Sequence, residues 1–289
     1  MPELPEVESL RRILARSAIG RTIVSAKVLE PRLRRKVVHD FESAITGREI
    51  EGLSRRAKYL MLKLSGDRVL LVHLGMSGSL THRGVSRPRS RPGAPIKDNE
   101  GDPLDAAHDH VEFRLDDGTR LVYNDPRRFG LLKLAPSGGL DELAELRALG
   151  PEPLGEGFTA DYLALKARGR RVAVKNMLMD QRIVAGIGNI YAAEILFRAG
   201  VRPTRRAGRL SRAEIERIVA ATPAILNEAI GKRGTTFRSY RDSRGRPGAF
   251  ASRLRVYGRE GEPCYTCSTP IRNVTVGQRA SFFCARCQK

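Results

Sequence analysis

Residues 110–125 read HVEFRLDDGTRLVYND. Apolar and polar side chains alternate on both sides of Asp117–Gly118, and an Asp-Gly pair between two alternating runs predicts a β-hairpin. Other runs in the first half of the chain have the same β-strand character, namely RTIVSAKVL (21–29), YLMLKLS (59–65), RVLLVHLG (68–75) and FGLLKLAP (129–136). The first 135 residues therefore predict a body made of β-strands.

One helix is expected before this body and several after it. Val7, Leu10 and Leu14 recur at helical spacing, with Pro5 near the start of the run and Gly20 at its end. A connection around residues 138–153 is followed by helical segments at TADYLALKARG (159–169), RVAVKNMLMDQR (171–182), NIYAAEILFRAG (189–200) and SRAEIERIVAATPAILNEAIGKRG (211–234). The pattern predicts an α+β protein with more than one domain.

The charge of the chain predicts a polyanionic partner. Its 289 residues include 52 Lys and Arg against 32 Asp and Glu, a formal net charge of +20, which is typical of proteins that bind nucleic acid. From residue 202 onward there are 19 basic and 6 acidic residues. An arginine-rich genome would explain a general excess, but it explains this concentration less readily.

The chain lacks the sequence signals of membrane insertion or export. No apolar run approaches the roughly 20 residues that span a bilayer. The first ten residues, MPELPEVESL, carry glutamates where a signal peptide carries positive charge. We therefore expect a cytoplasmic protein with no membrane partner.

Four cysteines near the end of the chain predict a metal site. Cys264 and Cys267 form one C-x2-C pair and Cys284 and Cys287 form another, at the spacing of a four-cysteine zinc site. Four thiolates fill the tetrahedral shell of Zn²⁺ and leave no position for a reactive water, so we expect one structural zinc ion. Two disulfides or four free thiols are the alternative. The run IRNVTVGQRASFF (271–283) between the pairs alternates like a hairpin and places Arg279 near its tip.

The first residues of the chain could form a nucleophilic site. Removal of Met1 would leave Pro2 with a secondary α-amine, and α-amines have a pKa of about 8, below that of lysine. Attack of a secondary amine on a sugar C1′ gives an iminium ion whose fixed positive charge acidifies the C2′ hydrogens. Glu3 and Glu6 lie three residues apart on one helical turn, where they are suited to proton transfer. The alternative is an ordinary helix start, since Pro and Glu both favour the first turn.

Several longer motifs carry a family resemblance. They are MPELPEVE (1–8), RRAKYL (55–60), HLGMSGSL (73–80), NDPRRFG (124–130), GIGNIYAAEILF (186–197) and GTTFRSY (234–240), followed by the four cysteines. In this order and combination the chain resembles the formamidopyrimidine-DNA glycosylase family over essentially its whole length. The resemblance implies a β-sandwich, a helix–two-turns–helix domain and a zinc finger, with DNA between two lobes.

The resemblance also implies domain limits. We expect a catalytic β-sandwich domain at 1–135 with its N-terminal helix, a linker at 136–152 and the helix–two-turns–helix domain at 153–233. A lesion-recognition loop with its connection follows at 234–256, and the zinc finger with its β-hairpin occupies 257–289. The family members imply a monomer.

Catalytic roles follow from the same resemblance. Pro2 resembles the nucleophile that attacks C1′, and Glu3 resembles the general acid and base at the sugar ring. Glu6 resembles a supporting carboxylate. Lys58 resembles the lysine that binds a phosphate beside the damaged nucleotide and assists β-elimination, and Arg279 resembles the finger arginine that assists δ-elimination.

A second set of residues resembles the DNA-contacting residues of the family. Met76, Arg127 and Phe129 resemble the three side chains that fill the gap left by an extruded base, and stacking groups together with a hydrogen-bonding arginine suit that task. Taken without the resemblance, Met76 and Phe129 could equally be core residues. Asn189 at a helix start and Lys175 resemble residues that contact the DNA backbone.

The stretch GTTFRSYRDSRGRPGAF (234–250) resembles the loop that covers the flipped purine. Candidate base contacts in it are Thr235, Thr236, Arg238 and Tyr240. The loop favours oxidised purines over the pyrimidine lesions of endonuclease VIII-like relatives. Two departures from the family pattern are Ser239, where an acidic residue is common, and a long, polar segment at 82–107 that could add contacts through Arg83, Arg87, Arg89 and Arg91.

Together these features predict a bifunctional DNA glycosylase and AP lyase of base-excision repair. Its partner would be double-stranded DNA containing 8-oxoguanine or formamidopyrimidines, bound mainly through phosphates. Chemistry would pass through the Pro2 iminium and end in β,δ-elimination. The alternatives are an endonuclease VIII-like glycosylase for oxidised pyrimidines and a non-catalytic zinc-ribbon DNA-binding protein.

Overall fold

The computed structural model describes residues 2–84, 105–236 and 242–289, which fall into two compact units. The first unit comprises Met1–Leu143 and Lys232–Ala249, and the second comprises Ala144–Gly231 and Phe250–Lys289. The described residues 234–236 and 242–249 of the candidate lesion loop thus belong with the β-strands rather than with the helices that precede them. The described helices include none that is both long and apolar enough to cross a membrane.

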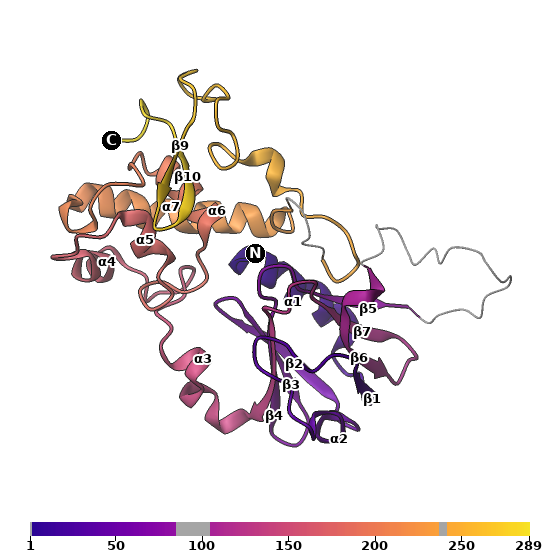
Figure 1. Cartoon of the computed structure of the whole chain (residues 1–289). Helices are drawn as coiled ribbons and strands as arrows, with labels where there is room; N and C mark the ends of the chain where they lie inside the picture. The colour runs from indigo at the N-terminus through magenta and orange to yellow at the C-terminus, as the bar shows by residue number, and fades with distance from the viewer. Residues whose placement is uncertain (1, 85–104, 237–241) are drawn as a thin grey trace, which may run out of the picture. The chain divides into compact units, whose positions relative to one another are not determined.

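The first unit contains two four-stranded antiparallel sheets (Figure 1). One sheet has the order β1-β6-β7-β5 and the other the order β2-β3-β4-β8. The strands are β1 (Ile23–Val28), β2 (Ile50–Arg56), β3 (Tyr59–Leu64), β4 (Arg68–His73), β5 (Ser79–Arg83), β6 (Asp109–Leu115), β7 (Arg120–Asn124) and β8 (Leu131–Pro136). The helices are α1 (Leu4–Ala18) and the short α2 (Phe41–Ile45), with 3-10 turns η1 (Ala106–His108) and η2 (Ser137–Glu142).

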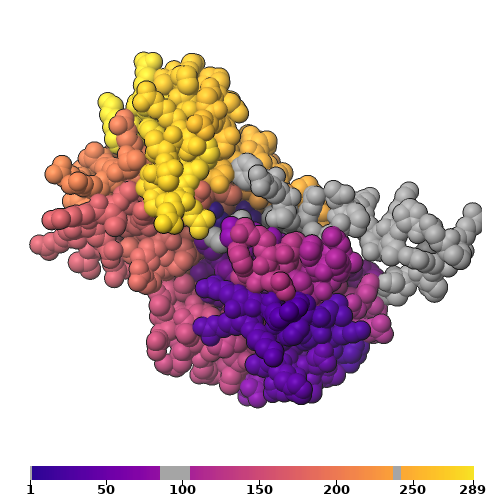
Figure 2. Space-filling model, in the orientation of Figure 1, coloured from indigo at the N-terminus to yellow at the C-terminus, as the bar shows by residue number. Residues whose placement is uncertain are grey.

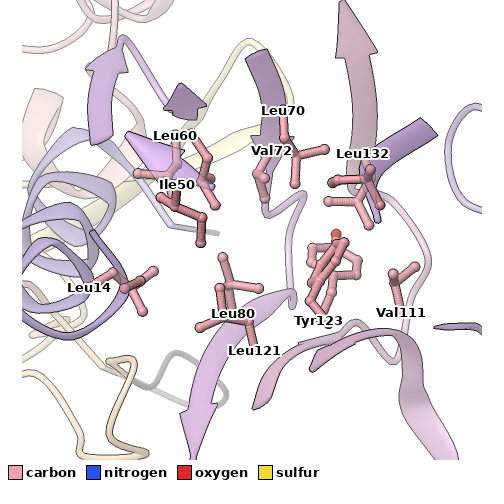
Figure 3. Packing of buried hydrophobic residues seen from close by; sticks show 14 of the residues in the cluster. Leu14, Ile50, Leu60, Leu70, Val72, Leu80, Val111, Leu121, Tyr123 and Leu132 are labelled. Atoms are coloured by element: carbon pink, nitrogen blue, oxygen red, sulfur yellow. The ribbon is translucent and has the colours of Figure 1, made fainter. Parts of the chain in front are cut away.

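The two sheets face each other across one apolar core, so the predicted β-sandwich is confirmed. Figure 3 shows Ile50, Leu60, Leu70, Val72 and Leu132 of one sheet pointing toward Leu80, Val111, Leu121 and Tyr123 of the other. The predicted apolar face of α1 closes this core, because Val7, Leu10 and Leu14 are fully buried in it. Fully burying one such side chain contributes about 1.5–3 kcal/mol, so the face fixes the helix against the sheets.

The hairpin predicted at residues 110–125 is present as β6 and β7. Leu115 N–H donates to the carbonyl of Thr119, and Gly118 has a φ of +81°. A three-residue loop of this kind needs a left-handed residue in its last position, which glycine adopts without strain. The expected strands at 21–29, 59–65, 68–75 and 129–136 are also confirmed.

Strands β2 and β5 and helix α2 were not predicted. Both strands lie at the edge of their sheets, and their sequences IEGLSRR and SLTHR carry little alternation. Pairing with a neighbour, rather than their own pattern, makes them strands. Because β5 runs to Arg83, the described start of the predicted 82–107 loop is a strand end. Arg87, Arg89 and Arg91 lie outside the described residues.

The second unit contains the predicted helices and the finger hairpin. The helices are α3 (Ala144–Arg147), α4 (Ala160–Ala167), α5 (Val174–Met179), α6 (Asn189–Arg198) and α7 (Arg212–Gly231), with 3-10 turns η3 (Ala207–Arg209) and η4 (Phe250–Arg253). The hairpin strands are β9 (Arg272–Val276) and β10 (Arg279–Phe283). Figure 2 shows this finger, in yellow, against the helical segments of the same unit.

One glutamine organises the connection between α5 and α6. The Gln181 amide donates to the carbonyls of Met179 (2.9 Å) and Ile187 (2.8 Å) and accepts the Gly186 N–H (2.8 Å). Gly186 has a φ of +86°, which a residue with a side chain rarely adopts. The connection therefore delivers Asn189 as the first residue of α6.

Candidate active site and DNA-contacting residues

The N-terminal end of α1 brings two of the predicted acidic residues together. Pro2 is buried, and Glu3 and Glu6 are only 2% and 1% exposed. The Glu3 N–H donates to Oε2 of Glu6 at 2.7 Å, which is half of a capping box. A buried carboxylate is costly without partners, so this contact holds Glu6 at a fixed position one helical turn after the predicted nucleophile.

Glu6 also holds the stem of the candidate lesion loop. Its Oε1 accepts the N–H of Thr235 at 2.7 Å. A Cβ on the neighbouring Gly234 would lie 2.6–3.0 Å from Glu6 side-chain atoms, and Gly234 has a φ of +78°. Only glycine fits this position, because a side chain would meet both a steric and a conformational penalty. One carboxylate thus joins the start of the chain to residue 235.

Three further contacts hold the described ends of the loop, two between the ends themselves and one to β5. Thr235 forms a β-bridge with Ala249, and Thr236 Oγ1 accepts the Gly248 N–H at 2.9 Å. The Ser243 carbonyl accepts the His82 N–H of β5 at 2.7 Å. Arg238 and Tyr240, which were predicted to contact the base, lie outside the described residues, as does Ser239.

Lys58 lies in the two-residue turn between β2 and β3 and is 6% exposed. Ala57 before it has a φ of +53°.

His73, at the end of β4, is a neutral imidazole at neutral pH. Burial, then the charges of Lys58 and Arg34, lower the pKa of His73 to about 4. Its Nδ1 accepts the Gly75 N–H at 3.0 Å.

The three candidate gap-filling residues lie on two loops that touch. A Cβ on Gly75 would lie 2.5 Å from the Phe129 carbonyl carbon, so the loop that carries Met76 contacts the loop that carries Arg127 and Phe129. Phe129 is 46% exposed, and the Arg127 guanidinium lies 4.7 Å from its ring centroid. Met76 is half-buried. Phe129 is therefore not a core residue.

In the second unit, two candidate phosphate contacts meet the finger hairpin. The Asn189 amide donates to the Ala280 carbonyl (3.2 Å) and to the Tyr257 hydroxyl (3.4 Å). The Lys175 ammonium donates to the same Ala280 carbonyl (2.7 Å) and to Ser281 Oγ (2.6 Å).

Lys175 is fully buried. Its ammonium faces β10 rather than solvent, an arrangement that favours holding the finger over touching DNA directly. The predicted DNA contact of Lys175 therefore gains no support from this geometry.

Arg279 is exposed at the tip of the finger, as its place between the cysteine pairs predicts. It pairs with Val276 across the two-residue turn Gly277–Gln278, whose φ values are +55° and +61°. Two left-handed residues define a type I′ turn, which suits the twist of a tight hairpin. A Cβ on Gly277 would lie 2.4 Å from the Asn176 side chain, so the tip also packs on α5.

The four cysteines form the predicted cluster. All their sulfur atoms lie within 4.8 Å of one another, and the separations are 3.9 Å for Cys264–Cys287 and 3.4 Å for both Cys267–Cys284 and Cys267–Cys287. A tetrahedral zinc site with Zn–S bonds of about 2.3 Å requires S···S separations of about 3.8 Å. The cluster fits one zinc ion, and the disulfide alternative is wrong because none of the four sulfur atoms is bonded to another.

Glu194, which is 1% exposed on α6, was not predicted from the sequence. Its carboxylate accepts the N–H groups of Arg255, Val256 and Tyr257 at 2.9–3.0 Å. Burial raises the pKa of Glu194, while these three hydrogen bonds oppose that rise. The residue fixes the segment that leads into the finger. An acidic residue on the apolar face of a predicted helix was the available signal.

These features define a class, that of zinc-finger DNA-repair glycosylases with a buried acidic pair at the chain start. Family models agree part by part. The formamidopyrimidine-DNA glycosylase N-terminal domain matches residues 1–132, the H2TH domain of the same enzymes matches 149–240, and the zinc finger found in FPG and IleRS matches 261–289.

Full-length relatives are similar throughout. The formamidopyrimidine-DNA glycosylases of Syntrophotalea carbinolica and Halorhodospira halophila are 47% and 46% identical to this chain, with 100% of both chains covered. A Lactococcus lactis FPG mutant, solved in complex with a Fapy-dG containing DNA, is 31% identical with a TM-score of 0.87 and full coverage of both chains. The L. lactis Fpg in complex with abasic-site DNA is 32% identical, with a TM-score of 0.86 and 99% coverage of both chains.

The chain belongs to the formamidopyrimidine-DNA glycosylase family. Its members are DNA glycosylases of base-excision repair with AP lyase activity, and the resemblance seen in the sequence motifs is confirmed.

Proposed function

We propose that this chain removes 8-oxoguanine and formamidopyrimidines from double-stranded DNA and then cleaves the strand. The observation that carries the proposal is the buried start of α1, where Pro2 is followed by Glu3 and Glu6 and is joined through Glu6 to the lesion-loop stem. Relatives that are 44–47% identical over the whole chain carry the name of this activity. The names of those relatives and of the L. lactis Fapy-dG complexes supply the formamidopyrimidine substrate, and the family resemblance of the sequence motifs supplies 8-oxoguanine.

The chemistry begins when Met1 has been removed. The Pro2 nitrogen forms a bond to C1′ while the bond from C1′ to the base breaks, and the base leaves with the proton that the Pro2 N–H gives up. Glu3 donates a proton to the ring oxygen and so opens the sugar. The resulting iminium loses a C2′ proton as the C3′–O bond breaks. A second elimination then removes the C4′ proton as the C5′–O bond to the other phosphate breaks. Lys58 and Arg279 assist these two eliminations by stabilising the leaving phosphates.

Glu6 acts by position rather than by proton transfer. Two backbone N–H groups, from Glu3 and Thr235, donate to its two oxygens. Its task is therefore to set the distance between the nucleophile and the loop that covers the base. Thr235, Thr236, Arg238 and Tyr240 would form that loop's contacts with the lesion.

DNA binding uses the positive charge of the chain. Arg279 and Asn189 contact phosphates, and Lys175 holds the finger strand that carries Arg279. Met76, Arg127 and Phe129 fill the gap left by the extruded base. Because phosphate contacts release counterions, affinity falls steeply with salt.

Each part of the expected division has one task. Catalysis belongs to 1–135, connection to 136–152, binding of the DNA backbone to 153–233, lesion recognition to 234–256 and the zinc finger to 257–289. Zinc supplies the folding energy of the finger and takes no part in the chemistry. We further propose that the protein acts as a monomer on the chromosomal DNA of the bacterial cytoplasm.

Oxidised pyrimidines are a second candidate substrate. A wild-type L. lactis Fpg structure, 31% identical with a TM-score of 0.86, is a complex with DNA containing an oxidised pyrimidine. Excision from 8-oxoguanine and thymine-glycol duplexes, measured side by side, separates the two. Faster excision of thymine glycol would replace the purine proposal.

Borohydride trapping on 8-oxoguanine duplex DNA tests the mechanism. The wild-type protein should form a covalent adduct whose mass places the DNA on Pro2, and intact-mass measurement should show that Met1 is absent. Pro2→Gly should trap poorly while its DNA affinity stays close to that of the wild type. A protein that binds DNA, retains Met1 and gives no adduct would instead be the non-catalytic DNA-binding protein.

A further inference from the structure

A buried carboxylate lies between the two loops that carry the candidate gap-filling residues. Asp125 follows β7 in the motif NDPRRFG and is fully buried. Its side chain touches both loops. This residue has no part in the chemistry described above, so its burial needs a reason of its own.

The two oxygens of Asp125 collect donors from both loops. Oδ1 accepts the Ser77 hydroxyl at 2.6 Å, one residue after Met76, and the Arg127 N–H at 3.3 Å. Oδ2 accepts the Gly130 N–H at 2.8 Å, one residue after Phe129. The Tyr123 hydroxyl makes a long contact of 3.5 Å with the same oxygen. The carboxylate thus bonds directly next to each of the three candidate residues.

The donors around Asp125 are all neutral groups. Among the residues that the structure describes, no lysine or arginine side chain pairs with this carboxylate. A buried charge held only by neutral donors costs desolvation energy that an apolar side chain would not cost. Such a group is best explained by the geometry that its hydrogen bonds impose.

The backbone of the loops is as tightly constrained as their side chains. A Cβ on Gly130 would lie 1.6 Å from the Tyr123 hydroxyl oxygen. Arg128, between Arg127 and Phe129, has a φ of +56°, and its N–H closes a turn onto the Asp125 carbonyl at 3.0 Å. A left-handed arginine persists only where its surroundings enforce it.

We propose that Asp125 is a positioning residue that locks the two loops together, so that Met76, Arg127 and Phe129 enter the DNA as one rigid unit. The inference rests on the proposed function, because it assigns Asp125 to base extrusion in that reaction. A rigid probe loses less conformational entropy on insertion than three independent side chains would lose. The residue thereby acts on extrusion of the base and not on the chemistry at C1′.

The test compares Asp125→Asn with the wild type on three duplexes. In the first, 8-oxoguanine is paired with cytosine, in the second it faces a tetrahydrofuran nucleotide that has no base, and in the third a natural abasic site replaces the lesion. Asparagine has the same shape but turns one acceptor into a donor, which leaves a loop N–H or hydroxyl without its partner. Single-turnover excision on the first duplex should fall by about tenfold or more.

The loss in rate caused by Asp125→Asn should be smaller on the two duplexes in which no base pair has to be broken. On the second and third duplexes the variant should stay within about threefold of the wild type, because no base pair has to be broken. Fluorescence of 2-aminopurine placed beside the lesion should show slower insertion by the variant. A general folding defect would lower all three rates equally, and equal losses would overturn the proposal, as would wild-type rates on the first duplex.

Two further variants keep the test decisive. Ser77→Ala removes one donor to Asp125 and should show the same ordering of the three duplexes even if Asp125→Asn fails to fold. Tyr123→Phe removes the 3.5 Å contact with Asp125 and a 3.3 Å hydrogen bond to the His73 carbonyl. It leaves the Ser77, Arg127 and Gly130 donors of Asp125 in place and should match the wild type. If the wild type itself excises no 8-oxoguanine, the proposed function fails, and the insertion signal alone then decides the role of Asp125.

Discussion

Glu6 and Glu8 lie two residues apart on α1, are 1% and 8% exposed, and are held by different kinds of donor. Glu6 accepts two backbone N–H groups, from Glu3 and Thr235. Glu8 accepts from the side chains of Arg11, Arg12 and Arg55 at 2.8–3.3 Å. Backbone donors fix where chain segments lie, whereas arginine side chains chiefly neutralise charge. We therefore expect Glu6 to govern activity and Glu8 to govern stability.

The largest expected effect is at Glu6. Glu6→Gln should lower 8-oxoguanine excision by about a hundredfold, because an amide cannot accept from both N–H groups and a misplaced nucleophile costs about that factor. Single-turnover kinetics with trapped product measures it. Glu8→Gln is the matched control on the same helix. Equal excision rates for Glu6→Gln and Glu8→Gln would contradict the expectation that Glu6 governs activity and Glu8 does not.

Glu8→Gln should instead lower the free energy of unfolding by about 2 kcal/mol at neutral pH. Burial is the largest single influence on this group and raises its pKa. The hydrogen bonds of Arg11 and Arg12 and the charges of Arg11 and Arg55 together outweigh it and lower the pKa of Glu8 to about 2. Urea unfolding measures the loss. The folded variant should excise 8-oxoguanine within about threefold of the wild-type rate.

The pH dependence of the unfolding free energy gives a second test of the role of Glu8. A carboxyl whose pKa falls from 4.5 to about 2 on folding stabilises the protein fully above pH 4.5 and loses that contribution as the pH falls toward 2. The stability gap between wild type and Glu8→Gln should therefore be constant from pH 7 to pH 5 and close between pH 4.5 and 2. A gap that widens on acidification would contradict the assignment to Glu8.

The smallest effect is expected at Glu30. The Arg32 side-chain hydrogen bond, its backbone N–H and its charge lower the pKa of Glu30 to about 2, the same value as for Glu8. The Arg32 side chain is however 74% exposed, and solvent and salt screen such a pair. Glu30→Gln should leave urea unfolding unchanged within error at 0.15 M and at 1 M salt. A loss of unfolding free energy comparable to that of Glu8→Gln would show that exposure does not determine how much such an ion pair stabilises the fold.

Local patterns were sufficient for much of the fold. The face of α1, the Asp117–Gly118 hairpin and the cysteine spacing are all encoded within a few residues, and each was predicted. The edge strands β2 and β5 were not, because their conformation comes from a neighbouring strand.

Contacts between residues that are distant in the sequence are the part of the candidate site that could not be predicted. Ser77 and Asp125 are 48 positions apart, Glu6 and Thr235 are 229 apart, and Lys175 and Ser281 are 106 apart. The motifs identified the candidate residues, but only the folded chain shows that Lys175 faces the finger and that Asp125 joins two loops.

The three hydrogen bonds that Glu194 accepts have a consequence for metal exchange. They tie residues 255–257 to α6 independently of the four sulfur atoms. A protein stripped of its metal by a chelator would keep the root of the finger in place while the outer hairpin opens. Resupplied zinc would then have to close only the outer hairpin onto a root that is already in place, and recovery would be fast and independent of refolding of the β-sandwich.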